Sequence, residues 1–338
     1  MKHLRSLLPT ELECVVLNHG FPSYRANQVF AWCAKGVREW DGMRNVPKQL
    51  RSILSEQYTL TKYEILKKLV SERDGTIKYL SALEDGSAVE CVVMSYEHAN
   101  SVCVSTQVGC RMGCRFCASA EGGLVRNLEA GEMLDQVLLV QEDTAQRVGS
   151  VVLMGIGEPL DNYDNTLRFL QLICHPLGLN LSPRHISLST CGLVPRIDKM
   201  SEEGLPITLS ISLHAPEDDL RRNLMPGAAS HSVADVVDAG KRYSKRTGRK
   251  VYFEYVLLKG LNDGIDHAKQ LGLLLKGALC HVNLMHYNQV QGSDFRPSSR
   301  DTADRFGSVL LEYGVTSTVR RRLGADIDAA CGQLRSVL

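Results

Sequence analysis

Cys110, Cys114 and Cys117 lie in one short run, Gly109-Cys110-Arg111-Met112-Gly113-Cys114-Arg115-Phe116-Cys117. Their C-x3-C-x2-C spacing can supply three thiolates to one metal cluster. Clusters of the 4Fe-4S type normally use four cysteine ligands, so a motif of three leaves one iron with an open position. Catalytic metal sites likewise keep one coordination position free. The spacing therefore predicts a 4Fe-4S cluster in which one iron can bind a substrate.

Two other interpretations of these cysteines stay open. Cys114 and Cys117 alone form a C-x2-C pair, which is typical of a thiol redox site or of one half of a structural zinc site. A second C-x2-C pair, or a cysteine and histidine pair at zinc-finger spacing, does not accompany them in the sequence. The iron-sulfur cluster is therefore the favoured interpretation, with zinc and the redox pair as alternatives.

Length and composition indicate a globular protein. The chain has 338 residues, of which 44% are hydrophobic, enough for one large domain with a smaller appendage. Its eleven cysteines are scattered, and the first residues do not have the pattern of a signal peptide. We therefore expect a cytoplasmic protein with reduced thiols. No apolar stretch approaches the roughly 18 to 20 residues that cross a bilayer, so we expect no membrane span.

The net charge of +1 is not that of a strongly basic nucleic-acid binder. Two basic runs are nevertheless present, at residues 320–322 and at residues 241–250. Each run is able to neutralise phosphates, and each is equally compatible with a solvated helix face or loop.

Three regions follow one another along the chain. Residues 1–57 have helical spacing and form a predicted accessory domain, and residues 58–98 have a strand-like pattern interrupted by two Asp-Gly turns. Residues 99–338, the predicted catalytic domain, alternate between strand-like and helix-like stretches. The predicted strands are 102–106, 151–156, 186–189, 207–213, 251–258, 282–286 and 315–320, and the predicted helices include 129–145 and 263–276. This alternation predicts an α/β fold with helices packed outside a parallel sheet, either open or curled into a barrel.

Unusual residues fall where these strands end. The cysteine run follows the first strand, Gly157-Glu158 the second, Ser189 the third, His214 the fourth, Asn288 the sixth and Cys331 the last. Barrels of this class carry their chemistry at the carboxyl ends of the strands. We therefore expect these side chains to meet in one site.

The sequence resembles the family of radical S-adenosylmethionine (SAM) RNA methyltransferases called RlmN, with Cfr as its sister group. The matching stretches are the cysteine run, 155–159, 188–190, 212–216, and 326–334 around Cys331. Further matches are Ser71, Asp74-Gly75-Thr76, Lys78, Val89-Glu90, Cys103 and 253–255. The cysteine run alone marks a very large superfamily, whereas the terminal stretch with Cys331 makes the resemblance specific.

This resemblance implies a partial (β/α)6-type radical SAM barrel, one 4Fe-4S cluster and two SAM molecules per turnover. The implied reaction converts adenosine to 2-methyladenosine in 23S rRNA and in tRNA. Cys331 would first become S-methylcysteine, and a 5'-deoxyadenosyl radical from the second SAM would abstract hydrogen from that methyl group. The resulting carbon radical would add to adenine, and Cys103 would resolve the adduct through a transient disulfide with Cys331.

The resemblance also implies roles for the other residues. Glu90 would be the proton acceptor, although Cys103 competes for this role and a strand carboxylate can simply pair with a basic side chain. The SAM site would comprise Gly157, Glu158, Ser189, Ser212, Leu213, His214 and Asn288. An electron donor such as flavodoxin would be a partner, and the chain would act as a monomer.

Some positions depart from the family pattern. Gly227-Ala228-Ala229 follow Pro226 where Ile-Asn and a basic residue are usual, Met285-His286 replace Ile-Pro, and Cys191 replaces a small residue. These departures bear on the RNA contacts. The alternatives left open are Cfr-like methylation at carbon 8 and, in another class, a zinc-stabilised RNA-binding module without catalysis.

Overall fold

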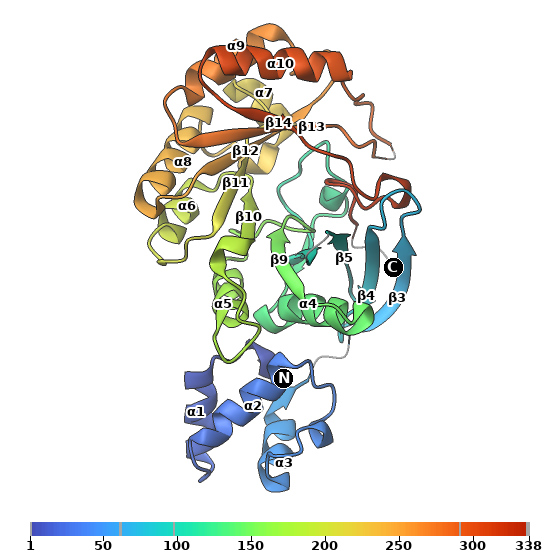
Figure 1. The fold of residues 1–338 in the computed structure, drawn as a ribbon, viewed down its shortest axis with the longest axis vertical. Helices are drawn as coiled ribbons and strands as arrows, with labels where there is room; N and C mark the ends of the chain where they lie inside the picture. Colours follow the sequence, from blue (N-terminus) through green and yellow to red (C-terminus); the bar gives the residue numbers. More distant parts are fainter. Residues whose placement is uncertain (1, 61–62, 97–98, 291, 336–338) are drawn as a thin grey trace.

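A ten-stranded mixed sheet forms the centre of the molecule (Figure 1). The computed structural model describes residues 2–60, 63–96, 99–290 and 292–335. The strand order is β14-β13-β12-β11-β10-β9-β6-β5-β4-β3. Neighbours from β6 to β14 pair in parallel, and β5, β4 and β3 continue the sheet in antiparallel pairing. The antiparallel strands are β3 (Glu64–Val70), β4 (Ile77–Ala82) and β5 (Ala88–Ser95).

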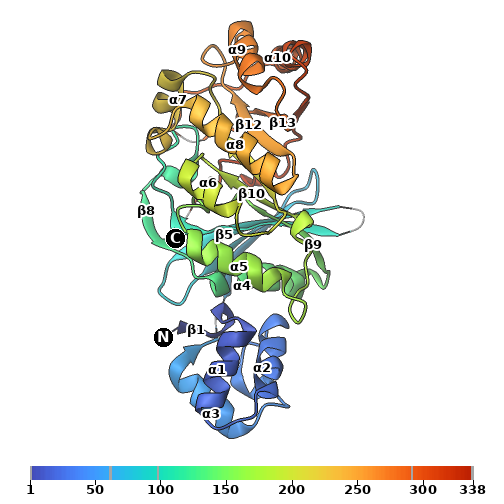
Figure 2. The ribbon, with the colours of Figure 1, turned by 90° about the vertical axis from the view of Figure 1, so that its left-hand side faces the viewer.

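The parallel strands and their crossover helices alternate as the sequence predicts. The strands are β6 (Asn100–Cys103), β9 (Val148–Leu153), β10 (Ile186–Thr190), β11 (Thr208–Ser212), β12 (Val251–Leu257), β13 (Cys280–His286) and β14 (Ser317–Val319). The helices are α4 (Ala130–Thr144), α5 (Tyr163–Cys174), α6 (Val194–Met200), α7 (Asp218–Leu224), α8 (Val233–Thr247), α9 (Ile265–Leu275) and α10 (Arg300–Glu312). The helices cover one face of the sheet (Figure 2). The predicted α/β class is confirmed, and the sheet order is that of an open sheet.

Local sequence explains where the crossover helices begin. Ser232 caps α8, because its hydroxyl accepts a hydrogen bond from the Asp235 amide at 3.1 Å while the Asp235 carboxylate accepts from the Ser232 amide at 3.2 Å. Glu129 and Glu132 form the same reciprocal pair at the start of α4. Such capping boxes satisfy amides that a helix leaves free at its amino end.

The helices of the first residues lie at one end of the molecule (Figure 1). They are α1 (Pro9–Asn18), α2 (Tyr24–Ala34) and α3 (Lys48–Gln57), with β1 (Lys2–His3) paired in parallel to β2 (Tyr58–Thr59). Leu4 and Val29 belong to the same apolar core as Met133 on α4. The domain boundaries at residues 57 and 98 stay predictions, and residue 98 itself lies outside the described residues. None of the described helices is both long and apolar enough to cross a membrane.

Candidate active site

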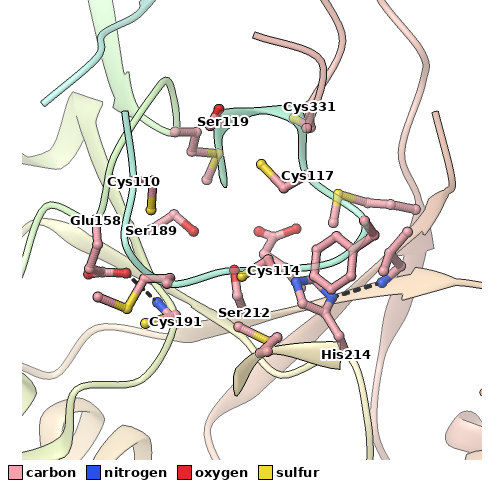
Figure 3. A pocket seen from close by; sticks show the side chains of 18 of the residues that line it. Cys110, Cys114, Cys117, Ser119, Glu158, Ser189, Cys191, Ser212, His214 and Cys331 are labelled. Carbon is pink, nitrogen blue, oxygen red and sulfur yellow. Dashed lines mark hydrogen bonds between the residues drawn. The ribbon is translucent and has the colours of Figure 1, made fainter. Parts of the chain in front are cut away.

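A cavity opens at the carboxyl ends of the parallel strands (Figure 3). It brings together most of the residues that the sequence singles out. These are Cys110, Cys114, Cys117, Gly157, Glu158, Ser189, Ser212, His214, Asn288 and Cys331. The expected convergence of strand ends is therefore found, and the chemistry of the site follows from what each side chain contacts.

The cysteine loop is fixed by a small second sheet. The strands β7 (Gln107–Gly109) and β8 (Leu124–Asn127) pair just before and after it. Gly109 has a φ of +75°, and a Cβ atom there would lie 2.0 Å from the carbonyl oxygen of Gly123. The Cys110 amide donates to that same oxygen at 2.9 Å. Only glycine permits this close approach, so Gly109 sets where the first thiol enters the cavity.

Cys110 is buried, Cys114 and Cys117 are half-buried, and the three thiols are close enough to influence one another. Burial raises the pKa of Cys110 to about 12, and the Cys117 sulfur adds to the increase. Burial also raises the pKa of Cys114 well above its usual range, with Cys117 and Cys110 contributing. Three such thiols resist ionisation without a positive partner, and binding of metal ions supplies that charge. The donor set therefore fits a metal cluster.

Among the described residues, no three cysteine, histidine or acidic side chains converge on a single metal ion. A 4Fe-4S cluster does not require this convergence, because each cysteine binds a different iron. Cys110, Cys114 and Cys117 instead surround an open space, with Cys110 and Cys117 on opposite sides in Figure 3. This arrangement favours a cluster over a mononuclear zinc site.

Glu158 presents a buried carboxylate at the end of β9. Its Oε2 accepts a hydrogen bond from the Cys191 amide at 2.7 Å, and its Oε1 accepts from the Leu160 amide at 3.0 Å. Desolvation raises the pKa of Glu158, and these hydrogen bonds oppose the increase. Gly157 has a φ of +104°, and a Cβ atom there would lie 2.6 Å from the Cβ of Gln107. The pair can present an oriented acceptor to a cationic group such as an amine.

His214 is held as a neutral imidazole. Its Nδ1 accepts a hydrogen bond from the Val256 amide at 3.0 Å, and burial lowers the pKa of His214 to about 3. The ring packs edge-on against Phe116 with a centroid distance of 4.7 Å. Because Nδ1 is an acceptor, the proton resides on Nε2. His214 can therefore donate a hydrogen bond to a ligand in the cavity.

Cys331 lies beside the cysteine loop, at the edge of the cavity (Figure 3). The Ala118 amide donates to the Gly332 carbonyl at 2.7 Å, and Asn288 Nδ2 donates to the Cys331 carbonyl at 3.1 Å. The surrounding atoms raise the pKa of the Cys331 thiol by desolvation, and Arg320 opposes this increase. Arg320 also lines the cavity and pairs with Glu254 at 3.6 Å.

Cys103 lies at the end of β6, behind the segment that carries Cys331. It packs in a small apolar cluster with Ala329 and Leu334 from that segment. Burial raises the pKa of Cys103, and Cys331 is the next largest cause of the increase. Both thiols are free in the structure. Their proximity agrees with the predicted exchange, while the transient disulfide itself stays a prediction.

Besides Cys103, two predicted residues lie outside the described lining of the cavity. The Leu213 side chain is fully buried in the main apolar core, so it does not itself face a ligand. Glu90 is buried in β5, where its Oε1 pairs with Lys78 Nζ at 3.0 Å and its Oε2 accepts from the Arg335 amide at 2.8 Å. The strand carboxylate thus pairs with a basic side chain, which is the simpler of the two interpretations of Glu90.

Several residues that line the cavity were given no role in the site by the sequence analysis. The side chains of Met112, Phe116, Met154 and Met225 form much of an apolar wall, and Glu254, Arg320 and Cys191 add polar groups. Sequence position offers a usable signal for Arg320, which ends a predicted strand as other site residues do, whereas Glu254 lies inside β12.

The two basic runs have different surroundings. Arg242 on α8 pairs with Asp198 at 2.8 Å, and Arg246 pairs with Glu202 at 2.7 Å, which is typical of a solvated helix face. In the run at residues 320–322, Arg320 faces the cavity, and Arg322 donates to the Tyr287 carbonyl at 3.1 Å. The run at residues 320–322 therefore contributes to the site itself.

Comparison with known proteins gives three consistent findings. Residues 104–271 match the model of the radical SAM superfamily. The chain is 50% identical over 332 residues to a probable dual-specificity RNA methyltransferase RlmN from Alkaliphilus oremlandii, covering 98% of this chain and 97% of the relative. The corresponding protein of Clostridium tetani is 47% identical over 335 residues, covering 99% and 96%. A radical SAM methyltransferase from Sphaerobacter thermophilus has a similar structure, with a TM-score of 0.94 and 41% identity over 100% of both chains.

Proposed function

The chain belongs to the RlmN family of radical SAM RNA methyltransferases, and from this premise we propose that it converts adenosine to 2-methyladenosine in 23S rRNA and in tRNA. One observation carries the proposal. Cys331 lies at the edge of the cavity that the three cysteines of the loop line, and Cys103 lies behind it. Three parts of the proposed mechanism are therefore close together: the thiol that would carry the methyl group, the thiol that would release it, and the cysteines that would hold the cluster.

Cys110, Cys114 and Cys117 hold the 4Fe-4S cluster. When bound, the cluster supplies the electron that cleaves SAM into methionine and a 5'-deoxyadenosyl radical. Glu158 and Gly157 receive the amino group of SAM, since a carboxylate fixed by two amides is already oriented toward a cation. Ser189, Ser212, His214 and Asn288 line the rest of the SAM site, with Leu213 contributing its backbone only.

Cys331 carries the methyl group in two stages. Its thiolate first attacks the methyl carbon of one SAM, forming an S–C bond and releasing S-adenosylhomocysteine. The 5'-deoxyadenosyl radical from a second SAM then takes a hydrogen atom from this methyl group and leaves as 5'-deoxyadenosine. A ring carbon between two nitrogens is a poor nucleophile, so a carbon radical is a suitable reagent for adenine C2.

Release of the product uses Cys103. After formation of a C–C bond between the methylene carbon and C2, the adduct would return one electron to the iron-sulfur cluster, which SAM cleavage leaves oxidised, and would lose the C2 proton to a base. Cys103 thiolate attacks the Cys331 sulfur, so that the S–S bond forms as the S–CH2 bond breaks. The freed carbon takes up a proton and becomes the methyl group, and a reductant restores both thiols. Glu90 is the proposed base, with Cys103 as the competing candidate.

The proposed partners follow from this chemistry. The substrates are 23S rRNA and tRNA, and a one-electron donor of the flavodoxin class supplies reducing equivalents. Each turnover begins with Cys103 and Cys331 as reduced thiols, which fits an enzyme of the reducing cytoplasm. We expect one chain to suffice, since all the proposed reacting groups come from it.

The direct test is nucleoside mass spectrometry. The anaerobically reconstituted protein is incubated with SAM, a reductant and unmodified 23S rRNA or tRNA transcripts. We expect 2-methyladenosine in both RNAs. Formation of 8-methyladenosine alone would replace this proposal with Cfr-like methylation. Absence of both products would count against both methylation reactions. A colourless protein that contains zinc and no iron would favour the binding module without catalysis.

A further inference from the structure

The segment that carries Cys331 has little regular structure of its own. It contains only a single turn of 3-10 helix, Ala325–Ile327, flanked by Gly324 and Asp328 in left-handed conformations. Residues 320–335 lie beside the turn that joins β3 and β4 (Figure 1). A short irregular segment has low local stability, so contacts with other elements determine where its side chains lie.

The turn between β3 and β4 makes three of these contacts. Asp74 Oδ2 accepts a hydrogen bond from the Gly324 amide at 2.9 Å. Ser71 Oγ donates to Asp326 Oδ1 at 2.7 Å, and the Glu72 amide donates to Asp326 Oδ2 at 3.1 Å. The turn and the segment are about 250 residues apart in the sequence, so these hydrogen bonds join two otherwise separate parts of the chain.

A buried charged pair on the adjacent strands makes the next contacts. Lys78 Nζ donates to the Asp328 carbonyl at 3.0 Å and pairs with Glu90 at 3.0 Å. Glu90 in turn accepts from the Arg335 amide at 2.8 Å. The side chains of Lys78 and Glu90 are 10% and 11% exposed. Buried charges require such partners, and here the backbone on either side of Cys331 provides them.

We propose that Ser71, Asp74 and Lys78 are positioning residues for Cys331, so that the antiparallel strands β3 and β4 belong to the catalytic machinery. None of the three side chains is among the described lining of the cavity. They act through residues 324–328, because Asp74 and Lys78 hold the backbone at the two ends of this turn and Ser71 holds the Asp326 side chain between them. This inference rests on the proposed function, because Cys331 must meet first a SAM methyl carbon and then a radical. Misplacement by about 1 Å is enough to slow such a step by about 100-fold.

The test uses the Ser71→Ala and Asp74→Asn double variant, reconstituted with iron. The matched control is Glu72→Gln, because the Glu72 side chain is exposed and only its amide contacts the segment. Two quantities are measured by peptide mass spectrometry: the methyl group acquired by Cys331 from SAM, and the rate of alkylation of Cys331 relative to exposed Cys14. Iron content and the midpoint of thermal unfolding are recorded for each protein.

We expect the double variant to keep its iron and its unfolding midpoint. Loss of the two hydrogen bonds that join the turn to the segment should change the alkylation rate of Cys331, which is itself exposed, at least threefold relative to Cys14 and lower its methylation about tenfold. Ser71→Thr, which retains a hydroxyl, should restore most of the methylation when combined with native Asp74. Lys78→Met serves as a second variant, with the same expected changes at Cys331.

An unchanged alkylation rate in the double variant would overturn the inference, and so would methylation within twofold of the unaltered protein. If the unaltered protein itself acquires no methyl group on Cys331, the proposed function fails instead. The alkylation rates still decide the positioning role in that case, because they require no SAM.

Discussion

Replacing Glu158 by glutamine should weaken SAM binding while leaving the cluster in place. The native carboxylate uses each oxygen for one backbone amide, that of Cys191 at 2.7 Å and that of Leu160 at 3.0 Å. A glutamine can accept from only one of these amides, because its other terminal atom is a donor. The variant therefore loses the negative charge, one hydrogen bond and the orientation of the acceptor.

The expected magnitudes follow from these contacts. A hydrogen bond to a charged group contributes about 1.5–3 kcal/mol, so loss of the bond to the SAM amino group should raise the Kd for SAM about 10- to 150-fold. One buried amide is left without an acceptor, which should lower the free energy of unfolding by about 1–3 kcal/mol. Iron content should not change, because no cysteine is altered.

The assay is equilibrium dialysis of labelled SAM against the anaerobically reconstituted protein. Glu132→Gln is the matched control, because Glu132 is also buried and accepts from the Glu129 amide and from Arg126 at 2.8 Å, outside the described lining of the cavity. The control should lose stability without losing SAM affinity. A Kd for the Glu158 variant within about threefold of the native value would refute the reasoning, as would an equal loss of affinity in both variants.

Three further predictions concern the site. In the unfolded chain His214 gains a proton below its ordinary pKa of 6.5, whereas in the folded protein it stays neutral down to about pH 3. The free energy of unfolding should therefore fall by up to about 1.4 kcal/mol per pH unit as the pH decreases through this window. His214→Asn, which tolerates the left-handed backbone and keeps an acceptor, should flatten this slope in urea titrations; an unchanged slope would contradict the assignment. Arg320→Met should raise the pKa of the Cys331 thiol and shift the pH profile of its alkylation upward, and a profile that does not move would exclude the proposed charge effect. Cys117→Ala should lose iron and brown colour whereas Cys14→Ala keeps both, and iron retained at the native level would rule out Cys117 as a ligand.

The fold was largely predictable because periodicity reports burial directly. The stretch 186–189 predicts β10 closely, since every second residue there is buried and the strand is flanked by turn residues. The predicted helix 129–145 corresponds to α4, which begins at a capping box that is visible in the sequence. The predicted strand 315–320 is shortened to Ser317–Val319, although the Arg320 amide still donates to the Leu284 carbonyl of β13 at 2.9 Å.

The site was predictable where spacing or strand ends carry information, and less so elsewhere. Cys110 and Glu158 follow strands, so their convergence could be expected. The hydrogen bond from the Arg335 amide to Glu90 joins residues that are 245 positions apart, and no local pattern encodes such a contact. The apolar wall that includes Met154 is likewise a product of packing, since methionine adapts to many surroundings.

The most direct test follows the methyl group from SAM to Cys331 and from there to adenosine. The protein is incubated anaerobically with SAM that carries a deuterated methyl group, and both the Cys331 peptide and the nucleosides of the RNA are analysed by mass spectrometry. We expect labelled S-methylcysteine at Cys331 before labelled 2-methyladenosine appears, and neither species in a Cys331→Ala variant that retains its iron. Labelled 2-methyladenosine made by that variant would contradict the central claim that Cys331 carries the methyl group.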